Sequence, residues 1–160
     1  MNVKIKKYNS NIYCLKTKQI IDKPIEEIWD FFTNPKNLNQ LTPHEMNFKI
    51  LSGKSDDFYE GKIISYSLNP FKFYNINWVT EITEITKNKS FIDEQRFGPY
   101  KMWHHEHHFV KNKDNTTTIY DKVIYKLPYG IIGRLAHKLF IKTKLSKIFI
   151  FRRTRIKQLF

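Results

Sequence analysis

Cysteine, glycine and long apolar runs are what this 160-residue chain most clearly lacks. Cys14 is its only cysteine, so an internal disulfide is impossible and a reducing compartment, the cytoplasm, is expected. Glycine occurs five times, and there is no Gly-rich phosphate loop, no Gly-x-Ser-x-Gly and no Cys-x-x-Cys. No stretch approaches the ~20 apolar residues of a membrane span, and residues 1–10 lack the apolar core of a signal peptide. These absences argue against phosphate-cradling enzymes, nucleophile-elbow hydrolases and membrane spans.

Acidic residues are missing from the last quarter of the chain. Residues 122–160 contain 11 Lys or Arg and no Asp or Glu, whereas residues 1–121 contain 17 basic and 15 acidic residues. Nearly all of the formal net charge of +13 therefore belongs to the C-terminal segment. Such a segment is either a solvated basic helix or a surface for an anionic partner: membrane headgroups, nucleic acid or an acidic protein.

The length and the lack of repeats or low-complexity linkers predict a single domain over residues 1–160. A first strand is predicted over Ile12–Ile21. Asp22 then provides an N-cap and Pro24 a first-turn residue for a helix, because both residue types favour helix starts. A second, short helix is predicted over Pro35–Leu41, where the following Thr-Pro pair stops it.

Turn-forming residues divide the middle of the chain into six further strands. Because short turns join consecutive strands, the sheet is predicted to be antiparallel. The predicted strands cover residues 47–52, 62–68, 73–85, 91–97, 101–110 and 117–127.

After residue 128 the apolar residues follow a helical period but occupy two different faces. Ile132, Leu135 and Leu139 share one face. Leu145 and Phe149 share another, about half a turn away at roughly 100° per residue. A single straight helix would be apolar on both sides, so we predict a break or bend near residues 141–144.

Residues 91–109 carry the most informative pattern. Alternate residues of a strand point to opposite faces. With a three-residue loop at residues 98–100, Asp93 lies opposite His105, and Phe91, Trp103 and Phe109 share their face. A two-residue loop would mix apolar and charged sets, so the hydrophobic pattern selects the three-residue loop. The opposite face is then mostly charged or polar: Ile92, Glu94, Arg96, His104, Glu106, His108 and Val110.

The last predicted hairpin extends the inward face. If odd-numbered residues of the strand over residues 101–110 pair with odd-numbered residues of the strand over residues 117–127, Asp121 lies beside His105 and His107 on the inward face. Asp93, His105, His107 and Asp121 then lie on three neighbouring strands. Aromatic and apolar side chains surround this polar cluster, a combination typical of ligand cavities. The expected ligand contacts are Tyr66, Trp78, Asp93, Gln95, Trp103, His105, His107, Phe109, Asp121 and Tyr125.

The order of strand, two short helices, six strands and long terminal helix resembles the START-like, or SRPBCC, superfamily. Local motifs sharpen the likeness to bacterial SRPBCC proteins described as ligand-binding or cyclase/dehydrase-like. The likeness spans about residues 15–155. The motifs include Trp29-Asp30-Phe31-Phe32, Leu41-Thr42-Pro43, Gly98-Pro99, Trp103-x-His105-x-His107-x-Phe109, Leu127-Pro128-x-Gly130 and Ile148-Phe149-x-x-Arg152.

This resemblance implies an α+β helix-grip fold. Its elements would be a seven-stranded curved antiparallel sheet around a long C-terminal helix, with two short helices after the first strand and a cavity between sheet and helix. It does not choose an activity, because the superfamily hosts lipid transfer domains, polyketide cyclases, ring-hydroxylating oxygenase subunits and hormone receptors.

Three interpretations of the cluster of Asp93, His105, His107 and Asp121 stay open. The four residues form a buried hydrogen-bonded network, or they anchor the polar end of a ligand. In the third interpretation they are catalytic candidates, as a His–Asp general acid/base pair. Metal binding is the least favoured version, because His-x-His can chelate but a third ligand has no spacing signature. We therefore expect no metal and no cofactor.

The leading hypothesis is a cytoplasmic protein that binds a small hydrophobic molecule with a polar end, such as a lipid, isoprenoid or aromatic metabolite. The alternative is a cyclase-, dehydratase- or isomerase-type enzyme that uses a His–Asp pair in the same cavity. The basic C-terminal helix would permit peripheral contact with an anionic membrane, where each Lys or Arg adds ~1 kcal/mol. Nucleic-acid binding is not favoured, because Phe149, among the basic residues, suits a core position better.

Overall fold

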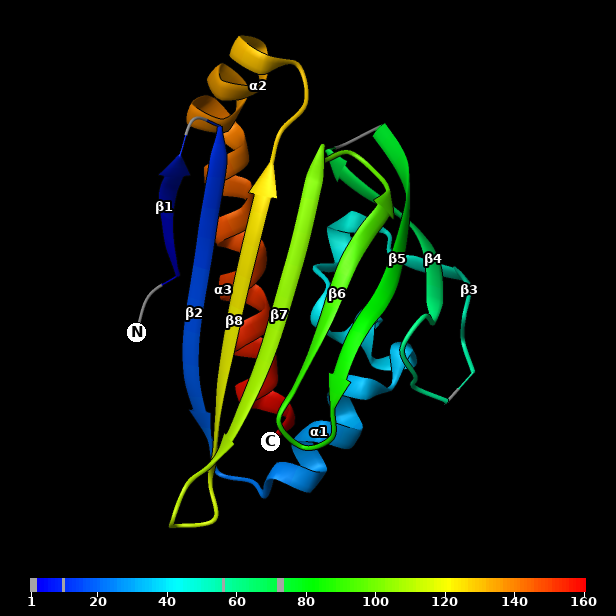
Figure 1. Cartoon of the computed structure of the whole chain (residues 1–160), viewed down its shortest axis with the longest axis vertical. Helices are drawn as coiled ribbons and strands as arrows, with labels where there is room; N and C mark the ends of the chain where they lie inside the picture. The colour runs from blue at the N-terminus through cyan, green and yellow to red at the C-terminus, as the bar shows by residue number, and fades with distance from the viewer. Residues whose placement is uncertain (1–2, 10, 56, 72–73) are drawn as a thin grey trace.

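The computed structural model describes residues 3–9, 11–55, 57–71 and 74–160. Within these residues one antiparallel sheet, in the order β1-β2-β8-β7-β6-β5-β4-β3, curves around the C-terminal helix (Figure 1). The predicted α+β helix-grip architecture is confirmed. The strands are β1 (Lys4–Asn9), β2 (Ile12–Ile21), β3 (Lys49–Ser52), β4 (Ile63–Phe71), β5 (Tyr74–Thr86), β6 (Ser90–Phe97), β7 (Met102–Lys111) and β8 (Thr117–Lys126).

The predicted strand count of seven is wrong by one, because the described residues form eight strands. The additional strand is β1, which pairs with β2 and places Ile5 opposite Leu15. It is rich in lysine and mostly exposed, with only Ile5 partly buried, as suits a strand at the edge of a sheet. Phe73, the predicted first residue of another strand, lies outside the described residues.

Two short helical segments follow β2, as predicted, and a third, single-turn segment follows them. They are α1 (Ile25–Thr33), η1 (Pro35–Leu41) and η2 (His44–Met46). The N-cap of α1 is Pro24, and no side chain caps it, so the prediction that Asp22 caps this helix is wrong. Two glutamates in the first turn favour its positive end instead.

The C-terminal helical region consists of α2 (Gly130–Ala136), η3 (His137–Ile141) and α3 (Lys142–Leu159). The predicted break near residues 141–144 is a π-helical turn, η3, which ends where the break was expected to begin. A π-turn changes the helical phase, so the apolar faces before and after it point in different directions. Among the described residues no helix is both long and apolar enough to cross a membrane.

Two core clusters fix α3 against the concave face of the sheet. In one cluster Ile156 packs with aromatic residues of α1, β6 and β7, where the Trp29 ring lies edge-on to Phe109 at 5.7 Å. In the other, Leu145 and Phe149 pack on β2 and β8. The helix is therefore anchored at two levels along its length, by Leu145 and Phe149 in one cluster and by Ile156 in the other.

Candidate functional site

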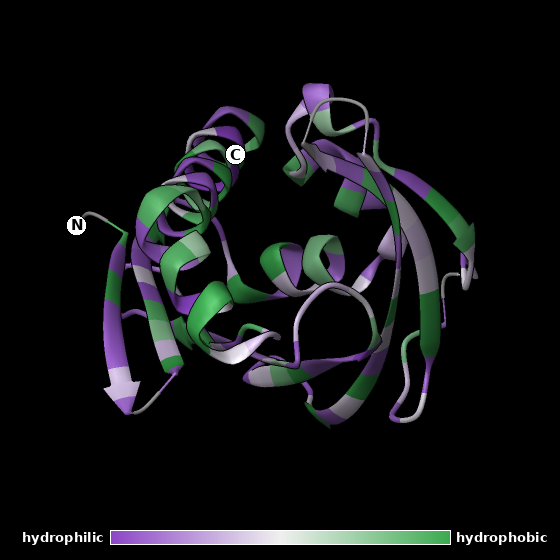
Figure 2. Ribbon diagram, turned by 90° about the horizontal axis from the view of Figure 1, so that it is seen from above, coloured by the Kyte–Doolittle hydropathy of each residue, from purple (hydrophilic) through white to green (hydrophobic). Residues whose placement is uncertain are grey.

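A cavity of about 260 Å³ lies between the sheet and α3. Viewed from above, the sheet forms a trough with α3 along its open side (Figure 2). Strands β4 and β5 supply one wall, and α3 supplies the opposite side. The main lining residues on these elements are Ile64, Tyr66, Leu68, Trp78, Thr80, Ile82, Leu145, Ile148, Phe149 and Arg152. Most of the lining is apolar or aromatic, as in small-molecule sites.

The register of the β6–β7 hairpin is the predicted one. Asp93 pairs with His105 and Phe91 with His107. On the other side of β7, His107 pairs with Asp121 of β8. The period of two therefore brings both histidines and both aspartates to one face, as the sequence pattern predicts.

The two histidines and two aspartates, which we call the inner ring, form a closed set of contacts. His105 lies with Nδ1 3.4 Å from Asp93 Oδ2 and with Nε2 3.3 Å from Asp121 Oδ1. His107 lies with Nε2 2.9 Å from Asp93 Oδ2 and with Nδ1 3.2 Å from Asp121 Oδ1. The two imidazole rings also contact each other, with centroids 3.8 Å apart. Each imidazole thus bridges both carboxylates.

Neighbouring side chains hold the inner ring in place. The Thr17 hydroxyl donates to Asp121 Oδ2 at 2.9 Å, and the Thr80 hydroxyl donates to Asp93 Oδ1 at 3.3 Å. The Phe91 ring stacks on His107 with centroids 4.2 Å apart. The ring is therefore preorganised by groups on β2, β5 and β6 rather than by solvent.

Burial and mutual contact shift the pKa values of the inner ring. Burial raises the pKa of Asp93, but nearby His105 and the hydrogen bond from His107 outweigh it and leave the pKa below its usual value. For Asp121 burial acts in the same direction, yet the two adjacent histidines bring its pKa well below the usual value. Burial and the adjacent His107 lower the pKa of His105 to about 4. At neutral pH both carboxylates are ionised and His105 is neutral.

Arg152 is a site residue that sequence reasoning missed. It lines the cavity from α3, with its guanidinium carbon 5.5 Å from the centroid of the Phe32 ring. Its Nε atom is buried and has no hydrogen-bond partner among the described residues. Its position in the sequence could have revealed it. Phe149, Arg152 and Ile156 recur at helical spacing, so the positive charge of Arg152 falls on the buried face of the helix.

Tyr66 and Trp78 add polar atoms to the mostly apolar wall. Burial, reinforced by Asp93, raises the pKa of Tyr66 well above its usual value, so its hydroxyl stays protonated. The indole Nε1 of Trp78 is buried without a hydrogen-bond partner in the described part of the chain. Buried donors of this kind normally find an acceptor. A ligand in the cavity could supply an acceptor for the Trp78 N–H.

The ten predicted ligand contacts divide into two groups. Six line the cavity: Tyr66, Trp78, Asp93, Trp103, His105 and His107. The other four are not among its lining residues. Asp121 lies behind the histidines, and Phe109 is buried in the core beside Trp29 and Phe32.

Gln95 and Tyr125 are the remaining two, and each has a structural partner elsewhere. The Gln95 amide closes the hairpin, because its Nε2 donates to the Tyr100 carbonyl at 2.7 Å and its Oε1 accepts from the Tyr100 N–H at 3.2 Å. The Tyr125 hydroxyl lies 2.8 Å from Nε2 of His137, which η3 brings over the end of β8. The alternation of inward and outward residues along a strand predicts neither contact.

His104 and His108 lie on the opposite face of β7, as predicted. His104 Nδ1 is 2.7 Å from Glu94 Oε1, and His108 Nε2 is 3.0 Å from Glu106 Oε2. We call these two histidines the outer pair. They contact glutamates at the solvent side of the sheet and cannot reach the cavity.

No protein-family model matches this chain, and none of the curated proteins matches it. Solved structures do share its fold. A START superfamily protein from Mycobacterium smegmatis is 15% identical, with 92% of this chain and 99% of that chain covered and a TM-score of 0.63. Major latex-like protein 151 from Panax ginseng is 12% identical, with 92% and 97% covered and a TM-score of 0.66.

A third solved structure is a point mutant of norcoclaurine synthase from Thalictrum flavum in complex with a transition state analogue. It is 13% identical, with 96% of each chain covered and a TM-score of 0.67. At such identities the similarity concerns the fold alone. The START-like, SRPBCC-type fold implied by the sequence motifs is confirmed.

Proposed function

We propose that this protein binds a small, mostly apolar molecule with a hydrogen-bond-accepting polar end in the cavity between the sheet and α3. The cavity itself is the observation that carries the proposal. Apolar and aromatic side chains form most of its wall, while the polar groups are few and include the inner-ring residues and Arg152. This division is typical of sites that bury a ligand's apolar body and orient its polar end.

The size of the cavity narrows the ligand class. Its volume of about 260 Å³ is slightly below the ~300 Å³ at which small-molecule sites usually begin. An aromatic metabolite or a short isoprenoid fits this space better than a two-chain lipid. The unpartnered Nε atom of Arg152 and Nε1 atom of Trp78 favour a carbonyl or carboxylate as the polar end.

Native mass spectrometry of the protein purified from its own host tests this proposal. We expect a co-purifying mass of a few hundred daltons. Ile148→Trp should abolish it, because Ile148 lines the cavity from α3 and the larger ring would fill the space. Ile150→Trp is the matched control, since Ile150 is exposed on the same helix. Equal retention by both variants would contradict binding in this cavity.

An enzyme is the second candidate, favoured by the 2.9 Å contact between His107 Nε2 and Asp93 Oδ2 at the cavity wall. A His–Asp pair can move a proton on a bound carbonyl compound in a cyclase, dehydratase or isomerase reaction. Replacing His105 and His107 by Gln separates the candidates. A binding protein should lose part of its affinity, whereas an enzyme should lose ~100-fold or more in turnover.

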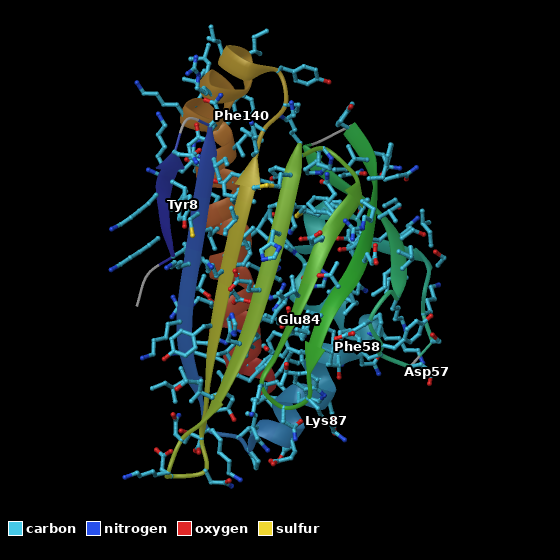
Figure 3. The ribbon with its side chains drawn as sticks, viewed as in Figure 1. Tyr8, Asp57, Phe58, Glu84, Lys87 and Phe140 are labelled. Atoms are coloured by element: carbon cyan, nitrogen blue, oxygen red, sulfur yellow. The ribbon has the colours of Figure 1, made fainter. Side chains whose placement is uncertain are left out.

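An exposed apolar surface on α2 and η3 supports contact with a membrane, and we call it the apolar tip. Figure 2 shows hydrophobic colouring on this end of the helical region, and Figure 3 labels Phe140 there. A large contiguous patch of exposed apolar residues on a protein surface usually marks an interaction site. The tip consists of Tyr129, Ile131, Ile132, Leu135, Leu139 and Phe140, which are 45–80% exposed.

Charge complementarity supports an anionic bilayer as the proposed partner of the apolar tip. Arg134, Lys138 and Lys142 lie between and beside the tip residues, and no acidic residue occurs after Asp121. An apolar helix face with basic neighbours is the pattern of interfacial membrane helices. Leu127 and Ile141, at either end of this segment, line the cavity, so the tip adjoins the cavity.

We propose the cytoplasm as the compartment, since a single buried cysteine needs no oxidising environment.

Co-sedimentation with phosphatidylcholine vesicles, with and without phosphatidylglycerol, tests the membrane contact. Binding should require the anionic lipid. It should fall at least ~10-fold in Ile131→Ser/Ile132→Ser/Leu135→Ser, because three apolar side chains that would insert into the bilayer are lost. The control is Ile20→Ser/Ile63→Ser, which removes exposed apolar residues from the sheet. Equal loss in the control, or equal binding to neutral vesicles, would contradict the proposal.

A further inference from the structure

The inner ring has more close nitrogen–oxygen contacts than hydrogen bonds. Its two imidazoles and two carboxylates make four contacts of 2.9–3.4 Å. Two of these have hydrogen-bond geometry, namely Nε2 of His105 with Asp121 and Nε2 of His107 with Asp93. The other two join Nδ1 of His105 to Asp93 and Nδ1 of His107 to Asp121.

The contacts of His107 show this difference most clearly. It is 2% exposed, and its Nδ1 atom is buried without a hydrogen-bond partner. Asp121 Oδ1 lies 3.2 Å from that atom without forming a hydrogen bond. A cation bound at Nε2 of His107, beside the Asp93 carboxylate, would place the imidazole proton on Nδ1, where it faces Asp121.

We propose that a divalent transition-metal ion binds Asp93, His105 and His107, with Asp121 orienting both imidazoles from behind. One ligand atom from each of the three residues lies within 4.8 Å of the others. Asp93 Oδ2 is 3.4 Å from His105 Nδ1 and 2.9 Å from His107 Nε2. Ligands at ~2.0–2.1 Å around a tetrahedral zinc ion are separated by about 3.3 Å, a value that lies between these two distances.

The proposed ion also accounts for every nitrogen of the ring. When His105 ligates through Nδ1 and His107 through Nε2, the remaining N–H groups are Nε2–H of His105 and Nδ1–H of His107. Both face Asp121 Oδ1, at 3.3 Å and 3.2 Å. Thr17 fixes the other oxygen of Asp121. A carboxylate that accepts from metal-ligating imidazoles is the usual outer support of such sites.

The donor set and the surroundings define the ion and what it would bind. Two imidazoles and one carboxylate suit Zn²⁺ or Fe²⁺, whereas Mg²⁺ and Ca²⁺ prefer oxygen ligands alone. All three ligating residues line the cavity, so the open coordination position faces the ligand. Two carboxylates, Arg152 and a divalent ion leave one positive charge, which favours an anionic oxygen there. This goes beyond the proposed function, because metal binding requires no cavity ligand.

Isothermal titration of chelator-treated protein with Zn²⁺, followed by Co²⁺ for its visible absorption bands, tests the inference. We expect one ion per chain. His105→Gln/His107→Gln should lose the site, and Asp121→Asn should weaken affinity ~10–100-fold, because it alters only the outer support. The matched control is His104→Gln/His108→Gln, which removes the outer pair and should leave one tightly bound ion.

Three results would overturn the metal site. They are no stoichiometric binding by the wild type, loss of binding in the outer variant, and full binding in the inner variant. Circular dichroism establishes whether each variant folds. If the inner double variant does not fold, Asp121→Asn decides the matter, and an unchanged affinity in that variant contradicts the inference.

Discussion

Strand β7 presents two pairs of histidines to two different environments. The inner histidines, His105 and His107, are 4% and 2% exposed and each contacts two aspartates. The side chains of the outer pair, His104 and His108, are 29% and 46% exposed and contact glutamates. Residue type and strand are the same on both faces. The difference is solvent access, because water screens the outer contacts while the interior strengthens the inner ones.

This comparison teaches that the curvature of the sheet, rather than the presence of His and acid residues, creates the site. On the convex face the pairs are ordinary surface contacts, each worth ~1 kcal/mol or less. On the concave face the same chemistry is enclosed by α3 and aromatic side chains. Equivalent substitutions on the two faces should therefore have unequal effects on stability and ligand affinity, and measuring both tests the comparison.

The largest expected effect is on stability. Asp121→Ala removes the buried carboxylate that both inner histidines and Thr17 contact, so it should lower the free energy of unfolding by ~3–5 kcal/mol. Glu106→Ala on the outer face should cost about 1 kcal/mol. Urea denaturation of both variants measures the difference. Similar losses in the two would show that the faces do not differ as we claim.

The next effect concerns ligand affinity. Arg152→Met removes the only described guanidinium that lines the cavity and should weaken binding of the anionic aromatic probe 8-anilino-1-naphthalenesulfonate ~10-fold or more. Lys147→Met, on the exposed face of α3, is the control and should change affinity less than twofold. Fluorescence titration gives both dissociation constants. If the two variants behave alike, the probe reports surface charge rather than the cavity.

A third buried histidine extends the comparison to another part of the fold and makes stability depend on pH. Burial, with a smaller contribution from Lys142, lowers the pKa of His137 to about 4, whereas an unfolded chain has ~6.5. Between these values the unfolded chain binds a proton that the folded chain does not, so stability falls as pH falls from 6.5 to 4. After allowance for solvent screening the loss is roughly 1–2 kcal/mol.

Urea denaturation at several pH values measures this dependence. His137→Gln removes the titrating group while keeping a polar partner for the Tyr125 hydroxyl, so its pH profile should be flatter. A profile as steep as that of the wild type would assign the pH dependence to other groups.

The smallest effect belongs to the outer pair. His104→Gln/His108→Gln should change the free energy of unfolding by ~0.5 kcal/mol, and the change should shrink further in high salt. Denaturation at low and high ionic strength checks this. A loss of several kcal/mol that salt does not alter would mean that the outer face is as tightly organised as the inner one.

The sequence predicted the parts of the fold that strand alternation controls. The β6–β7 register, the inward direction of His105 and His107 and the outward direction of His104 follow from a period of two and from Trp103, which only one register buries with Phe91. The interruption of the terminal helix followed from its two apolar faces. These signals are local and can be read within a few residues.

The sequence could not provide the contacts that strand alternation does not specify. Gln95 has the correct parity but lies beside the turn, where a local hydrogen bond to Tyr100 competes with a cavity position. The Tyr125 hydroxyl contacts His137 because η3 lies at the end of β8. Arg152 enters the site only once α3 lies in the trough. For Tyr125 and Arg152 the deciding contact joins segments whose relative placement no local pattern specifies.

One titration tests most directly whether the inner histidines face a ligand cavity. The same fluorescent probe is titrated into the wild type, His105→Gln/His107→Gln and His104→Gln/His108→Gln, three chains with matched substitutions on opposite faces of β7. We expect the inner substitutions to weaken binding ~10-fold or more and the outer ones to leave it within twofold. Equal affinity in all three chains would contradict a ligand site at the inner ring.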